Sequence, residues 1–392
     1  MATTDTTFDE LERTLSQGTV DEALDAFASR LREEGRHHEL FDCRLMQARR
    51  KHGLPLIVST TLDEWPEAIR TRMEDDYLAA CREVGRILLD QGRIRDAWVY
   101  LRPVGNREEV AAALEKLSPD DHAEEIIEIG LNEGVAPALG FGLLLERYGT
   151  CNAITMFDAE LGKVSRKQRQ QMATMLVRHL HGDLFGSLVA DITRQQGAKP
   201  RETTIAALVA DRDWLFDNDN YHVDTTHLSS VVRFALLVDD PEVLRLALEL
   251  TAYGERLAPQ FRFPGNEPFT DLYPSAALFI EGLLGTKGGE ARAWFKERAD
   301  QTDVNDVGTY PAEVYISLLA RTGQISEAID ALARLLPAGT RTGGFAPSLL
   351  ELAQTGHEYR QLTRVCREQG DLVGYAAGLL SARLEAASQR PA

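Results

Sequence analysis

Apolar residues recur at helical spacing along nearly the whole chain. An early example is the set Phe8, Leu11 and Leu15, whose members are three and four residues apart and so lie on one face of an α-helix. Sustained alternation of apolar and polar residues, which would predict β-strands, is almost missing. We therefore expect an all-α protein.

Several of these patterns occur in pairs that are joined by a short turn containing glycine. Gly18, Gly92 and Gly323 each separate two amphipathic segments. Glycine can end a helix in a left-handed conformation, and two helices joined in this way bury their apolar faces on each other. The chain is therefore predicted to form helical hairpins.

Aligned on these glycines, the second helices of the three hairpins agree at three positions. An aliphatic residue follows at +2, an alanine at +5 and a large apolar residue at +9. The residues are Val20, Ile94 and Ile325; Ala23, Ala97 and Ala328; and Phe27, Leu101 and Leu332. The small alanine allows two helices to approach closely, and the larger residues fill the seam between them.

With these features the chain resembles tetratricopeptide repeat proteins, whose helical hairpins carry a close-packing alanine early in the second helix. Gly85, seven residues before Gly92, matches the small residue in that family's first helix, and Pro103 and Pro337 follow second helices. These prolines come earlier than in the family, and the hairpins do not recur at its spacing of about 34 residues. The resemblance covers three or four hairpins. It implies helical hairpins stacked as a solenoid or superhelix.

The 392 residues exceed the usual size of a single hydrophobic core. We expect N-terminal helical hairpins over residues 1–160, a central helical region over 161–300 and C-terminal hairpins over 301–392. The proline-bounded segments 55–66 and 337–347 are predicted to be loops.

The formal net charge of −18 and the sequence pI of about 5.0 bear on the choice of partner. So acidic a surface repels nucleic acid and anionic lipid, and neither is expected as a partner. A basic island, formed by Lys163, Arg166, Lys167 and Arg169, is too short to change this expectation. No apolar run approaches the ~20 residues that span a bilayer, and the first residues lack the pattern of a signal peptide. The four cysteines form no Cys-x-x-Cys pair, so we expect a cytoplasmic protein without a disulfide framework.

The segment 211–273 interrupts the helical pattern and gathers aromatic and polar residues in irregular stretches. Rings supply contact area and polar atoms orient a ligand, so the segment is a candidate pocket. The candidate ligand-binding residues are Trp214, Tyr221, Phe263, Glu267, Asp271 and Tyr273. Alternatively, the same rings cover a helical core beneath two long loops.

A candidate metal site lies within this segment, at His222, Asp224 and His227. His222 and Asp224 would point the same way from an extended lead-in, and His227 would lie in the first turn of a helix. Two imidazoles and a carboxylate suit zinc or another divalent metal. Asp224 is equally a suitable N-cap for that helix, with the two histidines bonding nearby backbone groups. We favour the cap, because caps are far commoner than metal sites.

Common catalytic signatures are missing: there is no dinucleotide-binding glycine motif, no phosphate-binding loop, no His-Glu-x-x-His and no Gly-x-Ser-x-Gly. We therefore expect a helical-repeat binding or scaffold protein that recognises a protein or peptide partner. The alternative is an enzyme, with or without a metal, that uses a pocket in residues 211–273. A second cluster, His179, His181 and Asp183, would then add ligands or an acid–base pair. Otherwise it is simply a helix end before Gly182.

Overall fold

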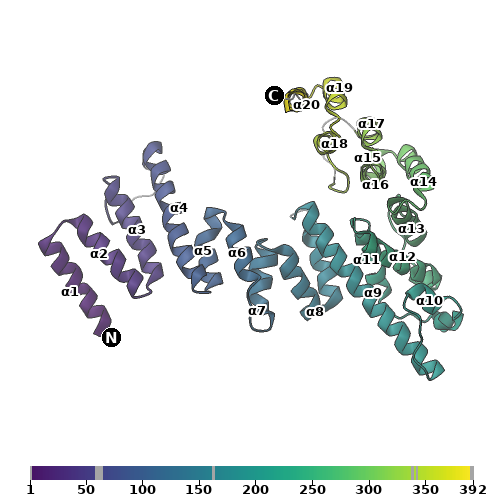
Figure 1. The fold of residues 1–392 in the computed structure, drawn as a ribbon, viewed down its shortest axis with the longest axis horizontal. Helices are drawn as coiled ribbons and strands as arrows, with labels where there is room; N and C mark the ends of the chain where they lie inside the picture. Colours follow the sequence, from purple (N-terminus) through teal and green to yellow (C-terminus); the bar gives the residue numbers. More distant parts are fainter. Residues whose placement is uncertain (1, 58–64, 161–163, 337–339, 341–342, 389–392) are drawn as a thin grey trace. The chain divides into compact units, whose positions relative to one another are not determined.

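The computed structural model describes residues 2–57, 65–160, 164–336, 340 and 343–388 (Figure 1). Helices joined by short turns make up most of these residues, and no strand occurs among them. The prediction of an all-α protein is therefore confirmed. The described parts of the two predicted loops are also non-helical; residues 58–64, 337–339 and 341–342 lie outside the described residues.

The chain divides into two compact units, residues 1–143 and 144–392. The first unit contains α1 (Ala2–Gln17), α2 (Val20–Glu33), α3 (His37–Lys51), α4 (Glu67–Asp90), α5 (Ile94–Val104), α6 (Arg107–Leu114), α7 (Pro119–Glu125) and a π-helical segment, η2 (Ile126–Asn132). Helix α8 (Pro137–Glu160) crosses the division between the units. Each helix from α1 to α5 packs on the next one along the chain, and α6 then packs on η2.

The hairpin of α4 and α5 is built as its sequence predicts. Gly92 ends α4 with a left-handed φ of 74°, a conformation that glycine adopts without a steric cost. Ala97 is fully buried between the two helices. A Cβ on Gly85 would lie 2.6 Å from Cγ of Leu101, so only glycine permits this approach. The predicted hairpins α1–α2, α4–α5 and α16–α17 are all present as packed helix pairs.

The second unit begins within α8 and contains the remaining helices. These are α9 (Arg166–Gln196), α10 (Ile205–Val209), the 3₁₀ segment η3 (Asp213–Asp219), α11 (Thr225–Ala235), α12 (Pro241–Arg256), the 3₁₀ segment η4 (Pro259–Phe261), α13 (Leu272–Leu283), α14 (Gly288–Gln301), α15 (Val304–Val307), α16 (Tyr310–Arg321), α17 (Ile325–Leu335), α18 (Leu349–Gly356), α19 (Tyr359–Gln369) and α20 (Leu372–Ser388). The long helix α9 packs on α11 and α12. From α12 onward, successive helices pack on one another, apart from the short α15.

An aromatic cluster holds the middle of the second unit together. Phe279 and Phe295, both fully buried, meet edge to face with ring centroids 5.4 Å apart. Phe269, from the irregular segment before α13, lies 5.5 Å from Phe295 and 6.2 Å from Tyr310. Phe345 completes the cluster on Tyr310 at 5.4 Å. These ring contacts join α13, α14 and α16 to the segment that precedes α18. Tyr310 and Phe345 of this cluster also line a cleft described below.

None of the helices that the structure describes combines the length and the apolar character required to cross a bilayer.

Candidate functional site

His222, one of the predicted metal ligands, lies in a buried hydrogen-bond network. Its side chain is 5% exposed, and Nε2 lies 3.1 Å from Oδ2 of Asp191 on α9. Its Nδ1 lies 3.0 Å from the hydroxyl of Tyr253 on α12, and its backbone N–H donates to the same hydroxyl at 2.8 Å. The hydroxyl therefore donates its hydrogen to Nδ1, and Nε2–H donates to Asp191. The network fastens the segment before α11 to two helices.

The protonation of His222 follows from these contacts. Burial lowers the pKa of the imidazole, and the hydrogen bond and charge of Asp191 act in the opposite direction. A neutral ring has one N–H and one lone pair, and the network uses both. His222 therefore keeps no lone pair free for a metal ion while the network is formed.

Asp224 is confirmed as the N-cap of α11. Its Oδ1 accepts the backbone N–H groups of Thr226 at 2.8 Å and His227 at 3.2 Å. The hydrogen bond from the hydroxyl of Thr226 contributes most to lowering the pKa of Asp224. Across the described parts of the chain, no group of three or more His, Cys, Asp and Glu side chains is placed to hold a metal ion. His222, Asp224 and His227 thus do not converge as the metal hypothesis required, because His222 turns inward to Asp191 while Asp224 turns to its own helix.

Substitutions of Asp224 distinguish capping of α11 from metal binding. Asp224→Ala is expected to lower the free energy of unfolding by about 1 kcal/mol, because two N–H groups lose their acceptor, and Asp224→Asn should change it little, because asparagine caps equally well. Chemical denaturation of both variants and metal analysis of the parent protein check this. A metal-containing parent that loses its metal in the Asn variant would contradict a pure capping role.

The second histidine cluster lies in the interior of α9, not at a helix end, because the helix continues through Gly182 to Gln196. Nε2 of His179 lies 3.1 Å from the Thr150 hydroxyl and 3.2 Å from the Asp183 carboxylate. His181 instead contacts Glu249 on α12 at 3.1 Å. The two imidazoles thus have different partners, and each joins α9 to another element or stabilises it locally.

Two of the predicted ligand-binding residues are directed into the protein. Tyr273 is 1% exposed, and its ring covers Gly254, where an added Cβ would come within 2.4 Å of ring carbon Cδ1. Oε1 of Glu267 lies 3.6 Å from Nη1 of Arg298. Both side chains therefore contribute to packing between elements of the second unit.

The other four predicted ligand-binding residues lie nearer the surface. Trp214 is half-buried on η3, and Asp271 is exposed at the start of α13 without making a side-chain cap. Tyr221 and Phe263 are exposed, and the ring of Tyr221 meets Phe261 edge to face at 5.1 Å. Rings that are close in sequence are thus divided between core and surface. None of the six predicted residues lines either of the two clefts described next.

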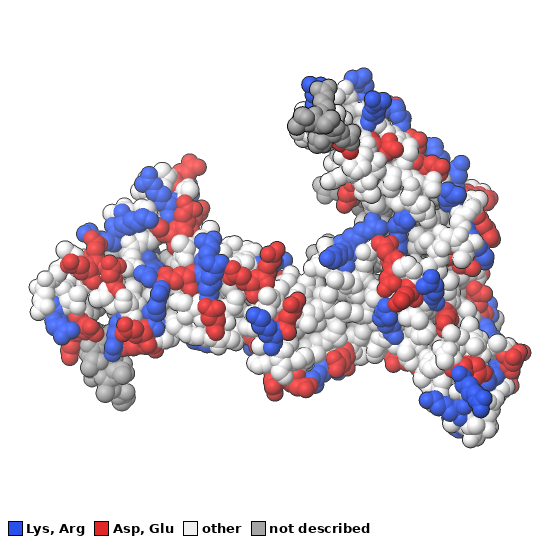
Figure 2. Space-filling model, viewed as in Figure 1, with Lys and Arg blue, Asp and Glu red and all other residues white. Residues whose placement is uncertain are grey.

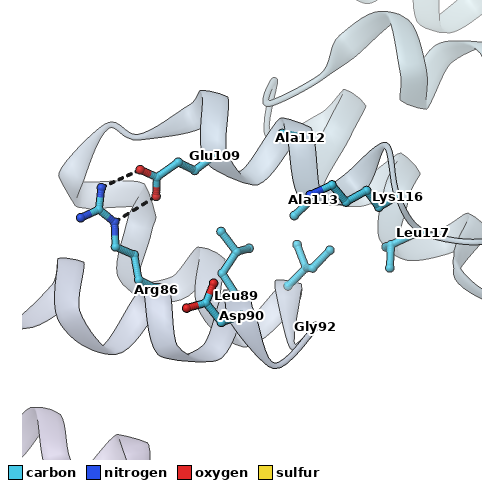
Figure 3. A pocket seen from close by; sticks show the side chains of 10 residues that line it. Arg86, Leu89, Asp90, Gly92, Glu109, Ala112, Ala113, Lys116 and Leu117 are labelled. Atoms are coloured by element: carbon cyan, nitrogen blue, oxygen red, sulfur yellow. Dashed lines mark hydrogen bonds and ion pairs between the residues drawn. The ribbon is translucent and has the colours of Figure 1, made fainter.

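A groove lies between α4, the start of α5 and α6 in the first unit, and we call it the α4–α6 groove. Its volume is about 640 Å³. Figure 3 shows Leu89 of α4 directed into the space below α6. The apolar lining residues are Leu89, Ile94, Ala112, Ala113 and Leu117. The floor of the groove is therefore apolar and lies between α4 and α6.

Charged side chains surround this floor. At one end Arg86 reaches across to Glu109, with Nε 3.1 Å from Oε2 and Nη2 2.6 Å from Oε1 (Figure 3). The hydrogen bond from Arg86 lowers the pKa of Glu109. Asp90 and Lys116 also line the groove, so both signs of charge are available to a bound molecule. All these residues fit ordinary amphipathic helices, so no sequence signal marked the groove.

The second unit contains a cleft of about 460 Å³ between α9, α11 and α16, which we call the arginine cleft. It is lined by Asp158, Arg169, Arg233, Phe234, Leu237, Val307, Gly308, Thr309, Tyr310, Glu313, Gly343 and Phe345. Arg169 belongs to the basic island noted in the sequence. That island was the one signal for this cleft, and it could not reveal the aromatic and acidic residues that pack beside it.

Glu313 forms the base of the arginine cleft and is 1% exposed. Its carboxylate accepts the backbone N–H groups of Gly343 at 2.7 Å, Phe345 at 3.3 Å and Ala346 at 3.5 Å. It also accepts the hydroxyl of Thr309 at 2.7 Å. These bonds satisfy a buried charge without a cation and fasten the segment 343–346 to α16. Glu313 therefore shapes the cleft, and its oxygens are already occupied.

The chain was compared with protein families, curated proteins and solved structures. No family model, no curated protein and no solved structure matches the chain.

Proposed function

We propose that the chain is a helical-repeat binding or scaffold protein that recognises a protein or peptide partner. The observation that supports this most is the α4–α6 groove, whose apolar floor is flanked by charges of both signs. Apolar side chains of a partner would contribute affinity there by leaving water, and Lys116 and Asp90 would orient it. A site of this kind requires no reaction chemistry.

The order of helix packing supports a solenoid in residues 1–143. Each helix from α1 to α5 packs on the next along the chain, as in stacked hairpins whose repeats contact only their neighbours. Stacked hairpins present extended surfaces, which suit polypeptide partners. The resemblance of the α4–α5 hairpin to tetratricopeptide repeats, carried by Gly85 and Ala97, points to the same class of protein.

The charge distribution favours a polypeptide over nucleic acid. On the face shown in Figure 2, acidic and basic side chains are interspersed and form no large basic patch, whereas a nucleic-acid site concentrates positive charge. The four cysteines are free thiols, which suits a reducing compartment and supports a cytoplasmic location.

A peptide-display selection against the purified full-length protein tests this function. We expect enriched peptides whose affinity falls at least about tenfold in Ala112→Glu, because the new carboxylate lies on the apolar floor of the groove and must be desolvated by the bound peptide. Fluorescence anisotropy with a labelled enriched peptide measures the change. Ala112 is exposed and helical, so the substitution should leave the fold intact.

Val99→Glu is the matched control. Val99 is 68% exposed on α5 and does not line the groove, so the same new charge there should leave the affinity unchanged. Enriched peptides that bind both variants equally would show that the groove is not the site. A selection that enriches no peptide would count against peptide recognition itself.

A further inference from the structure

The guanidinium group of Arg169, a half-buried residue, lines the arginine cleft. Nε of Arg169 is buried and has no hydrogen-bond partner among the described residues. Burial lowers the pKa of Arg169, and the charge of the nearby Arg166 lowers it further. A half-buried cation beside a second cation is stabilised by a bound anion.

A second guanidinium group lines the same cleft. Arg233 donates to the hydroxyl of Ser230 at 3.0 Å, which leaves most of its N–H groups for other acceptors. Asp158 also lines the cleft; burial raises its pKa, and the charge of Arg233 opposes this rise in part. Asp158 therefore offsets part of the charge of Arg233, whereas the charge that acts on Arg169 is that of Arg166.

The buried carboxylate in the cleft does not neutralise Arg169 either. Glu313 directs its oxygens to three backbone N–H groups and the hydroxyl of Thr309. By holding the segment 343–346, Glu313 places Gly344 beneath Arg169, where an added Cβ would lie 3.0 Å from Nη1. The guanidinium is therefore positioned by packing on backbone, without a salt bridge to this acid.

The remaining walls of the cleft are apolar. Phe234 lies on α11 and Leu237 follows the end of that helix, and Phe345 and Tyr310 meet edge to face. Burial raises the pKa of Tyr310, so this ring is a neutral, apolar wall at physiological pH. A volume of about 460 Å³ falls within the range of small-molecule sites.

We propose that the arginine cleft is a binding site for a carboxylate attached to an apolar group, with Arg169 and Arg233 receiving the carboxylate. A planar guanidinium offers paired N–H groups that match the two oxygens of a carboxylate. The apolar group lies against Phe234, Leu237 and Phe345. Two sources share this chemistry, a small organic acid and the C-terminus of a peptide. The site is separate from the α4–α6 groove and independent of the function proposed for that groove.

Isothermal titration calorimetry of the full-length protein tests the proposal with matched probes. N-acetylphenylalanine carries the carboxylate and an aromatic group, and N-acetylphenylalaninamide differs only in lacking the charge. The acid is expected to bind at least about tenfold more tightly than the amide, because only the acid carries a charge opposite to that of the guanidinium groups. The peptide acetyl-Ala-Ala-Ala-Phe, with a free C-terminus, distinguishes the two sources of the carboxylate. If the peptide binds more tightly than N-acetylphenylalanine, the natural ligand is the C-terminus of a peptide. If it binds more weakly, the natural ligand is a small organic acid.

Variants place the binding in the cleft. Arg169→Gln and Arg233→Gln should each lower the affinity for the acid at least about tenfold and leave the affinity for the amide unchanged. Arg245→Gln is the matched control, because Arg245 is exposed on α12 in the same unit and does not line the cleft. Arg233 is also exposed, so Arg233→Gln should leave the protein folded. This variant therefore tests the proposal even if Arg169→Gln unfolds the protein.

Three results would overturn the proposal. Equal affinity for the acid and the amide would exclude carboxylate recognition. Binding of the acid that is unchanged in both arginine variants would place it elsewhere. Tight binding of phenyl phosphate without measurable binding of either carboxylate probe would show that the cleft recognises phosphate instead. None of these results bears on peptide binding in the α4–α6 groove, whose test uses Ala112.

Discussion

His222→Ala is expected to lower the free energy of unfolding by about 2–4 kcal/mol, one of the two largest effects that we predict. The substitution removes a ring that is 5% exposed and bonded at both nitrogens. It deprives Asp191 of one donor and the hydroxyl of Tyr253 of its acceptor, and it leaves a cavity between α9 and α12. His357→Ala is the control, because the side chain of His357 is 65% exposed and pairs with Glu385 at the surface. We expect His357→Ala to lower the free energy of unfolding by less than about 1 kcal/mol.

The same network gives the stability a pH dependence. Burial lowers the pKa of His222 in the folded protein, so the unfolded chain takes up this proton first as the pH falls below about 6.5. The stability contributed by the neutral ring is fully present above that pH and is lost as the pH falls towards the lowered pKa of the folded state. Urea denaturation across this range should show a shallower fall in His222→Ala than in the parent. Parallel curves for the two proteins would contradict a neutral buried His222.

Glu313→Gln is expected to lower the free energy of unfolding by about 2–3 kcal/mol, although the two side chains have the same shape. The carboxylate accepts hydrogen bonds from three backbone N–H groups. In the Gln variant an NH₂ group replaces one carboxylate oxygen, and this donor then faces N–H groups that need an acceptor. The segment 343–346 should therefore be released first. Hydrogen exchange of Phe345 and Ala346 measures this local effect, and chemical denaturation measures the global one.

The control for this prediction is Glu290→Gln on α14, where the glutamate is exposed. Its effect should stay within about 0.5 kcal/mol, as is usual for surface substitutions. If Glu313→Gln changes neither the exchange of the segment 343–346 nor the denaturation midpoint, Glu313 does not fasten this segment. The position of the aromatic wall of the arginine cleft would then depend on Tyr310 and Phe279 instead, which both contact Phe345.

Local features of the fold could be predicted because they depend on residues that are close in sequence. The spacing of Leu88, Gly92 and Ala97 is sufficient to predict a helix, its left-handed end and a second helix packed on the first. The same holds for the cap at Asp224, where the acceptor and the N–H groups it receives lie within one turn. In each case the geometry of a single turn or hairpin sets the outcome. Packing with the rest of the chain adds little to it.

The histidine clusters show where such local patterns mislead. His222 and Asp224 are two residues apart, yet one side chain turns to α9 and the other to its own helix. Spacing along the chain predicts that two groups are near each other but not which of several partners each one takes. His179 likewise suggested a helix end before Gly182, whereas packing against α11 and α12 extends α9 through that glycine. Tertiary burial outweighed the local preference of one glycine, which costs only about 1 kcal/mol in a helix.

The sequence by itself determined that this protein is helical, that its helices pair into hairpins at Gly92 and Gly323, and that its formal charge is strongly negative. The tertiary structure alone decided which polar groups meet. Arg169 and Glu313 reach one cleft from helices far apart in the chain, and the spacing of the sequence does not show that they meet there. The physical reason is the distance along the chain over which the interactions act. Helix formation and capping depend on neighbours within a few residues, whereas a cleft depends on which helix faces pack together. That packing is set by burial summed over the whole unit.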